Sequence, residues 1–143
     1  MIIKSIPTLE DTKRLAETFA HHLTPGTCVA LDGDLGAGKT TFVKYCAHAL
    51  GVQDDLDSPT FTILKSYGPP RLHHMDAYRL DGDADDLEDA LFDEAAYIFV
   101  EWASNIKDQL PKRTLFLTFS QTHENRVVKI NGNGVLNEDL FND

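Results

Sequence analysis

Short apolar runs alternate with amphipathic stretches along most of the chain. The apolar runs are rich in β-branched and aromatic residues and predict strands, whereas the stretches with helical spacing predict helices. Strands are predicted over residues 1–5, 27–31, 61–67, 72–76, 97–101, 114–120 and 126–131. Helices are predicted over 9–23, 41–50, 85–96 (as one or two short helices) and 104–110. This mixture of β-α units and hairpins predicts an α/β fold, with a mixed central sheet flanked by helices.

Residues typical of helix caps and turns support these boundaries. Thr8 and Asp11 form a capping box ahead of the first helix. Pro25-Gly26 predicts a turn, and Gly68-Pro69-Pro70 predicts the turn of a hairpin. The acidic tail from Gly132 is expected to fray.

Length and composition are those of one globular domain over residues 1–143. Apolar residues make up 42% of the chain and charged residues 25%, which are ordinary values. An apolar run of about 18 residues is absent from the sequence, so no membrane span is expected. The N-terminus has neither the apolar core nor the cleavage site of a signal peptide. Cys28 and Cys46 lack metal or redox spacing and are predicted to be buried, reduced thiols of a cytoplasmic protein.

The net charge of −10 argues against direct binding of nucleic acid, which needs clustered Lys and Arg. Acidic residues concentrate between residues 81 and 101, where no Lys or Arg occurs. This run is either a solvated helix face with its cap or a docking surface for a basic partner. Its members are Asp81, Asp83, Asp85, Asp86, Glu88, Asp89, Asp93, Glu94 and Glu101.

The most informative motif is a P-loop between the predicted strand 27–31 and the predicted helix 41–50. Its glycines let backbone N–H groups turn onto phosphate oxygens, and the helix N-terminus adds a positive dipole end. Lys39 is positioned to reach the β- and γ-phosphates, and the Thr40 hydroxyl to bind Mg²⁺. The motif consists of Gly33, Asp34, Leu35, Gly36, Ala37, Gly38, Lys39 and Thr40.

A P-loop also needs an acid on the metal side, usually at the end of a neighbouring strand. Glu101 and Asp76 each end a predicted strand, and either is a candidate Mg²⁺ ligand, directly or through water. Thr60, in a loop stiffened by Pro59, is either a γ-phosphate sensor or a simple turn hydroxyl.

Three further residues carry open alternatives. Trp102 either stacks on a nucleotide base or fills the core. His73 and His74 invite a zinc interpretation, but no partner ligands stand at zinc spacing.

The chain has no Asn-Lys-x-Asp motif and no paired arginines in a lid-like loop. These features disfavour a GTPase and a small-molecule kinase, so the nucleotide is expected to be ATP.

Four motifs in order resemble the TsaE (YjeE) family. The combination in so short a chain is specific, although the P-loop alone is widespread. The resemblance covers roughly residues 26–111 and includes Leu31 to Phe42, Ser58-Pro59-Thr60-Phe61-Thr62, His74-Met75-Asp76-Ala77-Tyr78-Arg79-Leu80 and Glu101-Trp102.

The resemblance implies an Mg²⁺-dependent ATPase required for threonylcarbamoyladenosine in tRNA. It implies that residues 33–41, including Thr41, bind the nucleotide together with Trp102. Lys39, Thr60 and Glu101 would be catalytic, and Thr40, Asp76 and Glu101 would hold the metal ion. TsaD and TsaB are the implied partners, tRNA being reached only through them, and ATP hydrolysis would reset their complex. A nucleotide-gated binding module without hydrolysis and a small-molecule phosphotransferase remain the alternatives.

Overall fold

The computed structural model describes residues 1–34, 38–56, 63–80, 82–123 and 125–141. The seven strands are β1 (Ile2–Ser5), β2 (Cys28–Gly33), β3 (Leu64–Tyr67), β4 (Leu72–Asp76), β5 (Tyr97–Glu101), β6 (Thr114–Thr122) and β7 (Asn125–Asn131). The α-helices are α1 (Leu9–His22), α2 (Lys39–Leu50) and α3 (Glu88–Leu91). Short 3₁₀ helices are η2 (Asp85–Leu87), η3 (Ala103–Gln109) and η4 (Glu138–Phe141).

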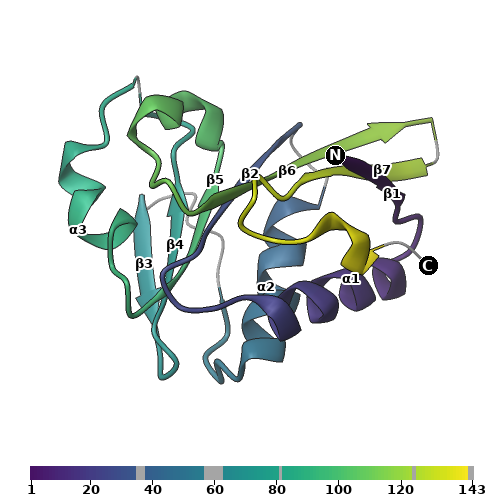
Figure 1. Ribbon diagram of the computed structural model, residues 1–143, viewed down its shortest axis with the longest axis horizontal. Coiled ribbons are helices and arrows are strands. Elements are labelled where there is room, and N and C mark those ends of the chain that lie inside the picture. The colour runs from purple at the N-terminus through teal and green to yellow at the C-terminus, as the bar shows by residue number, and fades with distance from the viewer. Residues whose placement is uncertain (35–37, 57–62, 81, 124, 142–143) are drawn as a thin grey trace.

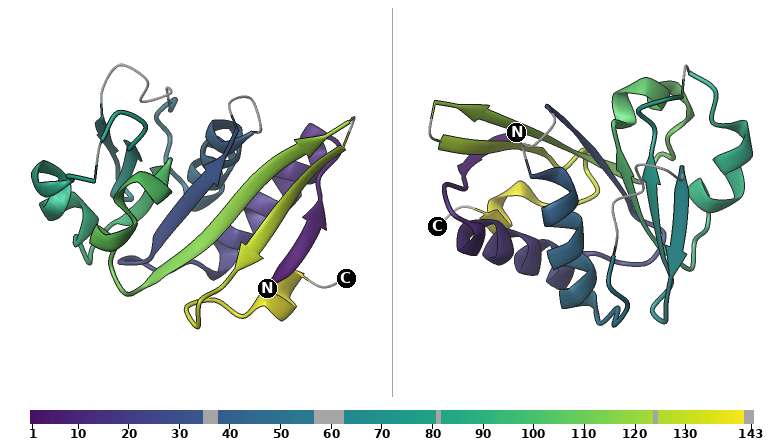
Figure 2. Two further views of the ribbon diagram at one scale, coloured as in Figure 1. Left: turned by 90° about the horizontal axis from the view of Figure 1, so that it is seen from above. Right: turned by 180° about the vertical axis from the view of Figure 1, so that it is seen from behind.

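The strands form one mixed sheet in the order β1-β7-β6-β2-β5-β4-β3. The central pairs β2/β6, β2/β5 and β4/β5 are parallel, and the outer pairs are antiparallel hairpins or edge pairs. Helices α1 and α2 pack side by side on one face, and α3 lies with η2 and η3 toward the other (Figures 1 and 2). The predicted α/β fold with a mixed sheet flanked by helices is confirmed.

Successive side chains of the central strands point to opposite faces of the sheet, which creates two apolar layers. In β2, Val29 and Leu31 join the layer under α1 and α2, whereas Cys28 and Ala30 face the layer under α3 and η3. A strand buried on both faces in this way reads as a continuous apolar run. The parallel order brings the carboxyl ends of β2, β4 and β5 to one edge of the sheet, where the predicted P-loop begins.

Local features predicted for the N-terminal half are confirmed. The Thr8 hydroxyl accepts a hydrogen bond from the Asp11 amide, and the Asp11 carboxylate accepts one from the Thr8 amide, each at 3.1 Å. Both cysteines are free and fully buried, and the Cys46 thiol donates to the Ala16 carbonyl oxygen across the α1/α2 contact.

Two predicted boundaries were wrong. The one or two short helices predicted over 85–96 are present as η2 and α3, but they end at Leu91, because the Asp93 carboxylate accepts the Ala95 amide and turns the chain. The short helix predicted over 104–110 is confirmed as the 3₁₀ helix η3, within one residue at each end. The strand predicted from residue 61 begins at Leu64 after a bend at Ile63, and residues 61–62 lie outside the described residues.

The tail is also better ordered than expected as far as Phe141. The Phe141 ring is 2% exposed and stacks on Phe19 of α1 with ring centroids 4.4 Å apart. Glu138 accepts the Gly132 amide and pairs with the ammonium group of Met1. These contacts hold residues 132–141 against the body of the domain. Across the described residues, no helix has the length and apolar character needed to cross a bilayer.

Candidate nucleotide site

The candidate site begins at Gly33, the last residue of β2. Gly33 pairs with Phe119 of β6 and has a φ of +136°. A β-carbon here would lie 2.1 Å from the Phe119 carbonyl oxygen, so no larger side chain fits. The first glycine of the predicted P-loop is therefore required by sheet packing as well as by its own positive φ.

The N-terminus of α2 presents its amide groups without a side-chain cap. Its N-cap is Gly38, which has a φ of +104° and makes no capping hydrogen bond, and the first turn carries no acid. A helix start of this kind is suited to an anion, because its N–H groups and its dipole both favour negative charge. Residues 35–37 of the predicted loop lie outside the described residues.

Lys39 is the cation of the site and is only 5% exposed. Its ammonium group donates a hydrogen bond to the Gly33 carbonyl oxygen and lies 3.8 Å from the centroid of the Trp102 ring. Burial lowers the pKa of Lys39 from its ordinary value, while nearby carboxylates, Glu101 first among them, oppose that shift. The side chain is folded back toward Gly33, at the start of the predicted loop.

Thr40 contacts Glu101, a residue 61 positions further along the chain. The Thr40 hydroxyl lies 2.9 Å from Oε1 and 3.0 Å from Oε2 of the Glu101 carboxylate, which is 5% exposed. The contact forms because β5 runs parallel to β2, with Glu101 opposite Leu31. A hydroxyl and a carboxylate are oxygen ligands of the kind that Mg²⁺ prefers, so this pair fits a metal ion.

Asp76 lies beside this pair. It ends β4 directly opposite Glu101 in the parallel register, and its Oδ1 accepts the Tyr78 amide at 2.9 Å. Burial is the main reason that the pKa of Asp76 is raised, and repulsion from Glu101 adds to it. Perturbed acids of this kind concentrate at functional sites.

Trp102 has a strained backbone, and its ring lies against the Lys39 ammonium group. Its φ of +58° is left-handed, a conformation that costs a non-glycine residue on the order of 1–3 kcal/mol. The exposed Tyr78 ring meets the indole edge-on, with centroids 4.9 Å apart. Strained backbone of this kind clusters at functional sites.

Two side chains that sequence reasoning did not single out hold this corner in place. Asp32 accepts the amide of Ser104 at 3.0 Å, which ties the end of β2 to η3. The side-chain amide of Asn105 donates to the carbonyl oxygens of Ala77 and Tyr78, which ties the segment after β4 to the same helix. No local sequence pattern distinguishes these bonds from ordinary surface contacts.

The predicted site residues therefore fall into three groups. Gly33, Gly38, Lys39, Thr40, Asp76, Glu101 and Trp102 gather at the carboxyl edge of the sheet. Asp34 is exposed and Thr41 half-buried next to them. Leu35, Gly36, Ala37 and Thr60 lie outside the described residues.

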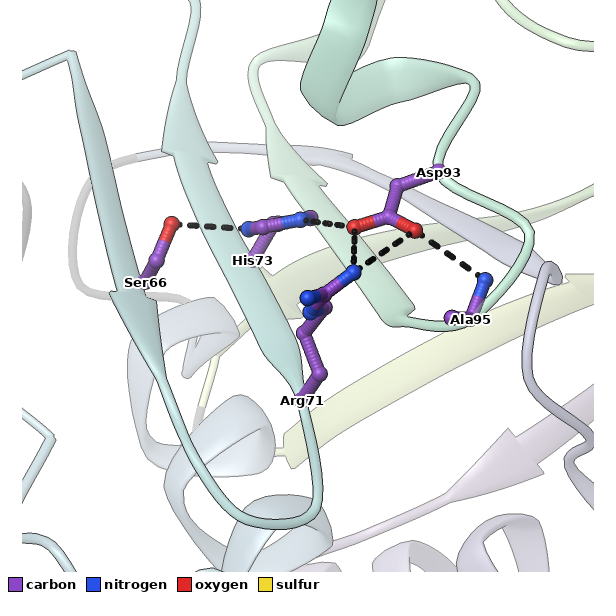
Figure 3. A network of polar contacts seen from close by, with 5 residues as sticks. All are labelled: Ser66, Arg71, His73, Asp93 and Ala95. Carbon is purple, nitrogen blue, oxygen red and sulfur yellow. Dashed lines mark hydrogen bonds and ion pairs between the residues drawn. The ribbon is translucent and has the colours of Figure 1, made fainter.

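Histidine neighbours in β4 have separate polar partners. His74 is fully buried, and its Nε2 lies 2.6 Å from Glu101 Oε2. His73 faces the other way, with its Nδ1 2.7 Å from the Ser66 hydroxyl and its Nε2 2.8 Å from Asp93 (Figure 3). The sequence held one indication of the His74 contact. A His-x-Asp stretch lies in the predicted strand 72–76, and the predicted strand 97–101 ends in Glu101.

The described residues of the acidic run between 81 and 101 have different surroundings. Asp93 also accepts from the Arg71 guanidinium, at 3.1 Å, so it links the β3–β4 hairpin to the turn before β5 (Figure 3). The hydrogen bond from His73 is the main cause that lowers the pKa of Asp93. Glu101 belongs to the site. The remaining described acids, on and around η2 and α3, are exposed.

Comparison with known proteins gives a consistent result. The family model for "Threonylcarbamoyl adenosine biosynthesis protein TsaE" matches residues 6–128. A protein of Bacillus subtilis (strain 168), named tRNA threonylcarbamoyladenosine biosynthesis protein TsaE, is 46% identical over 109 residues, covering 74% of this chain and 69% of its own length. A protein of the same name from Treponema pallidum (strain Nichols) is 39% identical over 114 residues, covering 76% and 84%.

A solved structure agrees with these sequence matches. The crystal structure of Bacillus subtilis YdiB superimposes with a TM-score of 0.78 at 34% sequence identity. The superposition covers 98% of this chain and 90% of YdiB. The fold described above is therefore shared with a solved protein over nearly its whole length.

Proposed function

The chain belongs to the TsaE family, and we propose that it is an Mg²⁺-dependent P-loop ATPase serving threonylcarbamoyladenosine formation in tRNA. It acts with TsaD and TsaB, and ATP hydrolysis resets that assembly between turnovers. The main structural support for this proposal is the contact of the Thr40 hydroxyl with the Glu101 carboxylate, at the start of α2 and beside Lys39. Phosphoryl transfer needs this set of groups, because its catalysis rests on positioning and charge neutralisation.

Each side chain has a distinct task in this proposal. Lys39 leaves the Gly33 carbonyl oxygen and the Trp102 ring to contact phosphate oxygens, and the amides at the start of α2 donate to them. Thr40 and Glu101 hold the metal side, with Asp76 as the second acid. A bound Mg²⁺ supplies neutralisation of the charge that develops on the phosphates.

Two residues complete the assignment. Glu101 is also the candidate for orienting the attacking water, because its carboxylate ends the strand next to the P-loop. Thr60 is proposed as the γ-phosphate sensor from the family resemblance alone, since it lies outside the described residues.

The charge of the chain favours protein partners over direct contact with tRNA. A net charge of −10 repels a phosphate backbone, so tRNA is reached through TsaD and TsaB. Two arginines have partners away from the candidate site: Arg71 pairs with Asp93, and Arg113 donates to Thr24. We therefore expect slow hydrolysis by the isolated chain and faster hydrolysis when a partner completes the site.

The test is phosphate release from Mg·ATP by the purified chain, alone and with TsaD and TsaB. Trp102 is the one tryptophan of the chain, so its fluorescence reports ATP binding in the same samples. We expect stimulation by the partners, loss of turnover with retained binding in Glu101→Gln, and loss of binding in Lys39→Ala. Lys44→Ala, which removes an exposed lysine from the same helix, is the matched control.

Other outcomes point to the alternatives. ATP binding with no phosphate release under any condition would favour a nucleotide-gated binding module. ADP release that depends on an added acceptor would favour a phosphotransferase. Normal ATP binding by Lys39→Ala would refute the P-loop assignment itself.

A further inference from the structure

We propose that His74 is a positioning residue, which holds the Glu101 carboxylate in the orientation needed on the metal side of the site. The inference rests on the proposed function, because it concerns the acid that would serve Mg²⁺ and the attacking water. It assigns a task to the buried histidine of the His74-Met75-Asp76 stretch in β4.

The sheet brings the two residues together on one face. His74 and Asp76 are two positions apart in β4 and so share a face, and Asp76 is the register partner of Glu101 in β5. The Glu101 side chain therefore lies between Asp76, directly opposite, and His74, diagonally opposite. His74 Nε2 reaches Glu101 Oε2 at 2.6 Å, a short distance typical of a hydrogen bond to an ionised acceptor.

The burial of His74 makes this hydrogen bond its single polar anchor among the described residues. The side chain is fully buried, and Nδ1 has no hydrogen-bond partner in the described part of the structure. A buried polar group left without a partner is destabilising. An apolar side chain would fill the same space without that cost, so packing alone gives no reason for a histidine here.

The direction of this hydrogen bond follows from the chemistry of its partner. An ionised carboxylate only accepts, so Nε2 is assigned as the donor to Glu101. The ring is thereby oriented by Glu101, and it in turn restrains Glu101.

Restraint of Glu101 matters because its other partner is the metal-side hydroxyl. Thr40 lies within hydrogen-bond distance of both Glu101 oxygens but has a single proton to donate. The terminal torsion of a Glu side chain is broad and roughly two-fold, so one partner does not fix the carboxylate plane. The hydrogen bond from His74 to Oε2 selects one orientation and leaves Oε1 for Thr40 and for water or metal.

The test compares His74→Leu with His73→Leu. Both remove a histidine from β4, but the second breaks the separate contacts with Ser66 and Asp93 on the opposite face. The first readout is the gain in ATP affinity that Mg²⁺ produces over EDTA, followed by Trp102 fluorescence. The second is phosphate release with TsaD and TsaB, and thermal unfolding is recorded for every variant.

Loss of a group that orients a metal ligand typically costs 10–100-fold in metal affinity or activity. In His74→Leu we expect at least a tenfold loss of the Mg²⁺-dependent gain, with ATP affinity in EDTA within threefold of the parent. His73→Leu should keep the gain, and His74→Gln, whose amide can donate, should recover part of it. In a Glu101→Gln background, His74→Leu should have no further effect.

The outcomes separate the two proposals. An Mg²⁺-dependent gain that is unchanged in His74→Leu, or lost equally in His73→Leu, overturns the positioning role. An additive effect of His74→Leu in the Glu101→Gln background overturns it as well. If the parent protein releases no phosphate at all, the ATPase assignment fails, while the Mg²⁺-dependent gain still decides the role of His74.

Discussion

Gly33 is the position where one added carbon atom tests how closely β2 and β6 approach beneath the candidate site. In Gly33→Ala the new β-carbon would lie 2.1 Å from the Phe119 carbonyl oxygen and 3.0 Å from its carbonyl carbon. Both atoms belong to backbone within the central sheet, so no flexible side chain can move aside. The strands must separate locally, and alanine must also accept a φ of +136°.

The size of the effect follows from these two costs. Backbone strain of this kind costs on the order of 1–3 kcal/mol, and overpacking adds roughly 1–3 kcal/mol. We therefore expect a loss of about 4 kcal/mol in the free energy of unfolding. With about 2.1 cal/mol/K of unfolding entropy per residue, a chain of 143 residues loses roughly 3.3 °C per kcal/mol, which gives a fall in Tm of about 13 °C.

Thermal unfolding followed by circular dichroism, without nucleotide, measures this effect. Gly38→Ala and Gly134→Ala are matched controls, because both glycines have positive φ but an added β-carbon would meet no described atom within 4 Å. Strain alone, about 1–2 kcal/mol, should lower their Tm by roughly 3–6 °C. If Gly33→Ala loses no more Tm than these controls, the close approach of β2 and β6 is refuted.

Three further predictions address the rest of the molecule. Because the pKa of Asp93 is lowered from 3.8 in the folded state, its contribution to stability is complete above about pH 4 and is lost as pH falls below that. Asp93→Asn should therefore flatten the acid limb of a curve of Tm against pH. An equally steep limb in Asp93→Asn and in the exposed control Asp89→Asn would contradict this. Cys28, whose pKa burial raises to about 12, and Cys46 should not react with a thiol reagent until the protein is unfolded, and rapid labelling of the native protein would show that they are accessible. Phe141→Ala should lower the free energy of unfolding by about 3 kcal/mol, measured by urea denaturation, whereas a change below about 0.5 kcal/mol would mean that the tail does not pack on α1.

Local pattern predicted most of the fold. The positions of all seven strands, the capping box at Thr8 and the hairpin around residues 68–70 follow from periodicity and turn chemistry within short windows. The failures have local causes that periodicity does not record. Residues 92–96 have helix-compatible composition, but the Asp93 carboxylate caps a turn instead and accepts from His73, which is distant in sequence.

The candidate site was predictable in its parts but not in its connections. The P-loop motif located Lys39 and Thr40, and the strand-end position singled out Glu101 and Asp76. That Thr40 meets Glu101 depends on β5 lying next to β2 in the sheet. The buried hydrogen bond from His74 depends on β4 lying beside β5 in one particular register.

The sequence by itself determined the α/β class, the strand and helix segments, and the residue types available for binding phosphate and metal, because spacing and residue chemistry are properties of short stretches. Only the tertiary structure decided which acid meets the P-loop threonine, which histidine supports that acid, and why Gly33 cannot be replaced. These features arise from strand order and register, which are set by burial summed over the whole sheet. No local stretch of sequence records that sum, so the same motif residues acquire their partners only when the sheet is assembled.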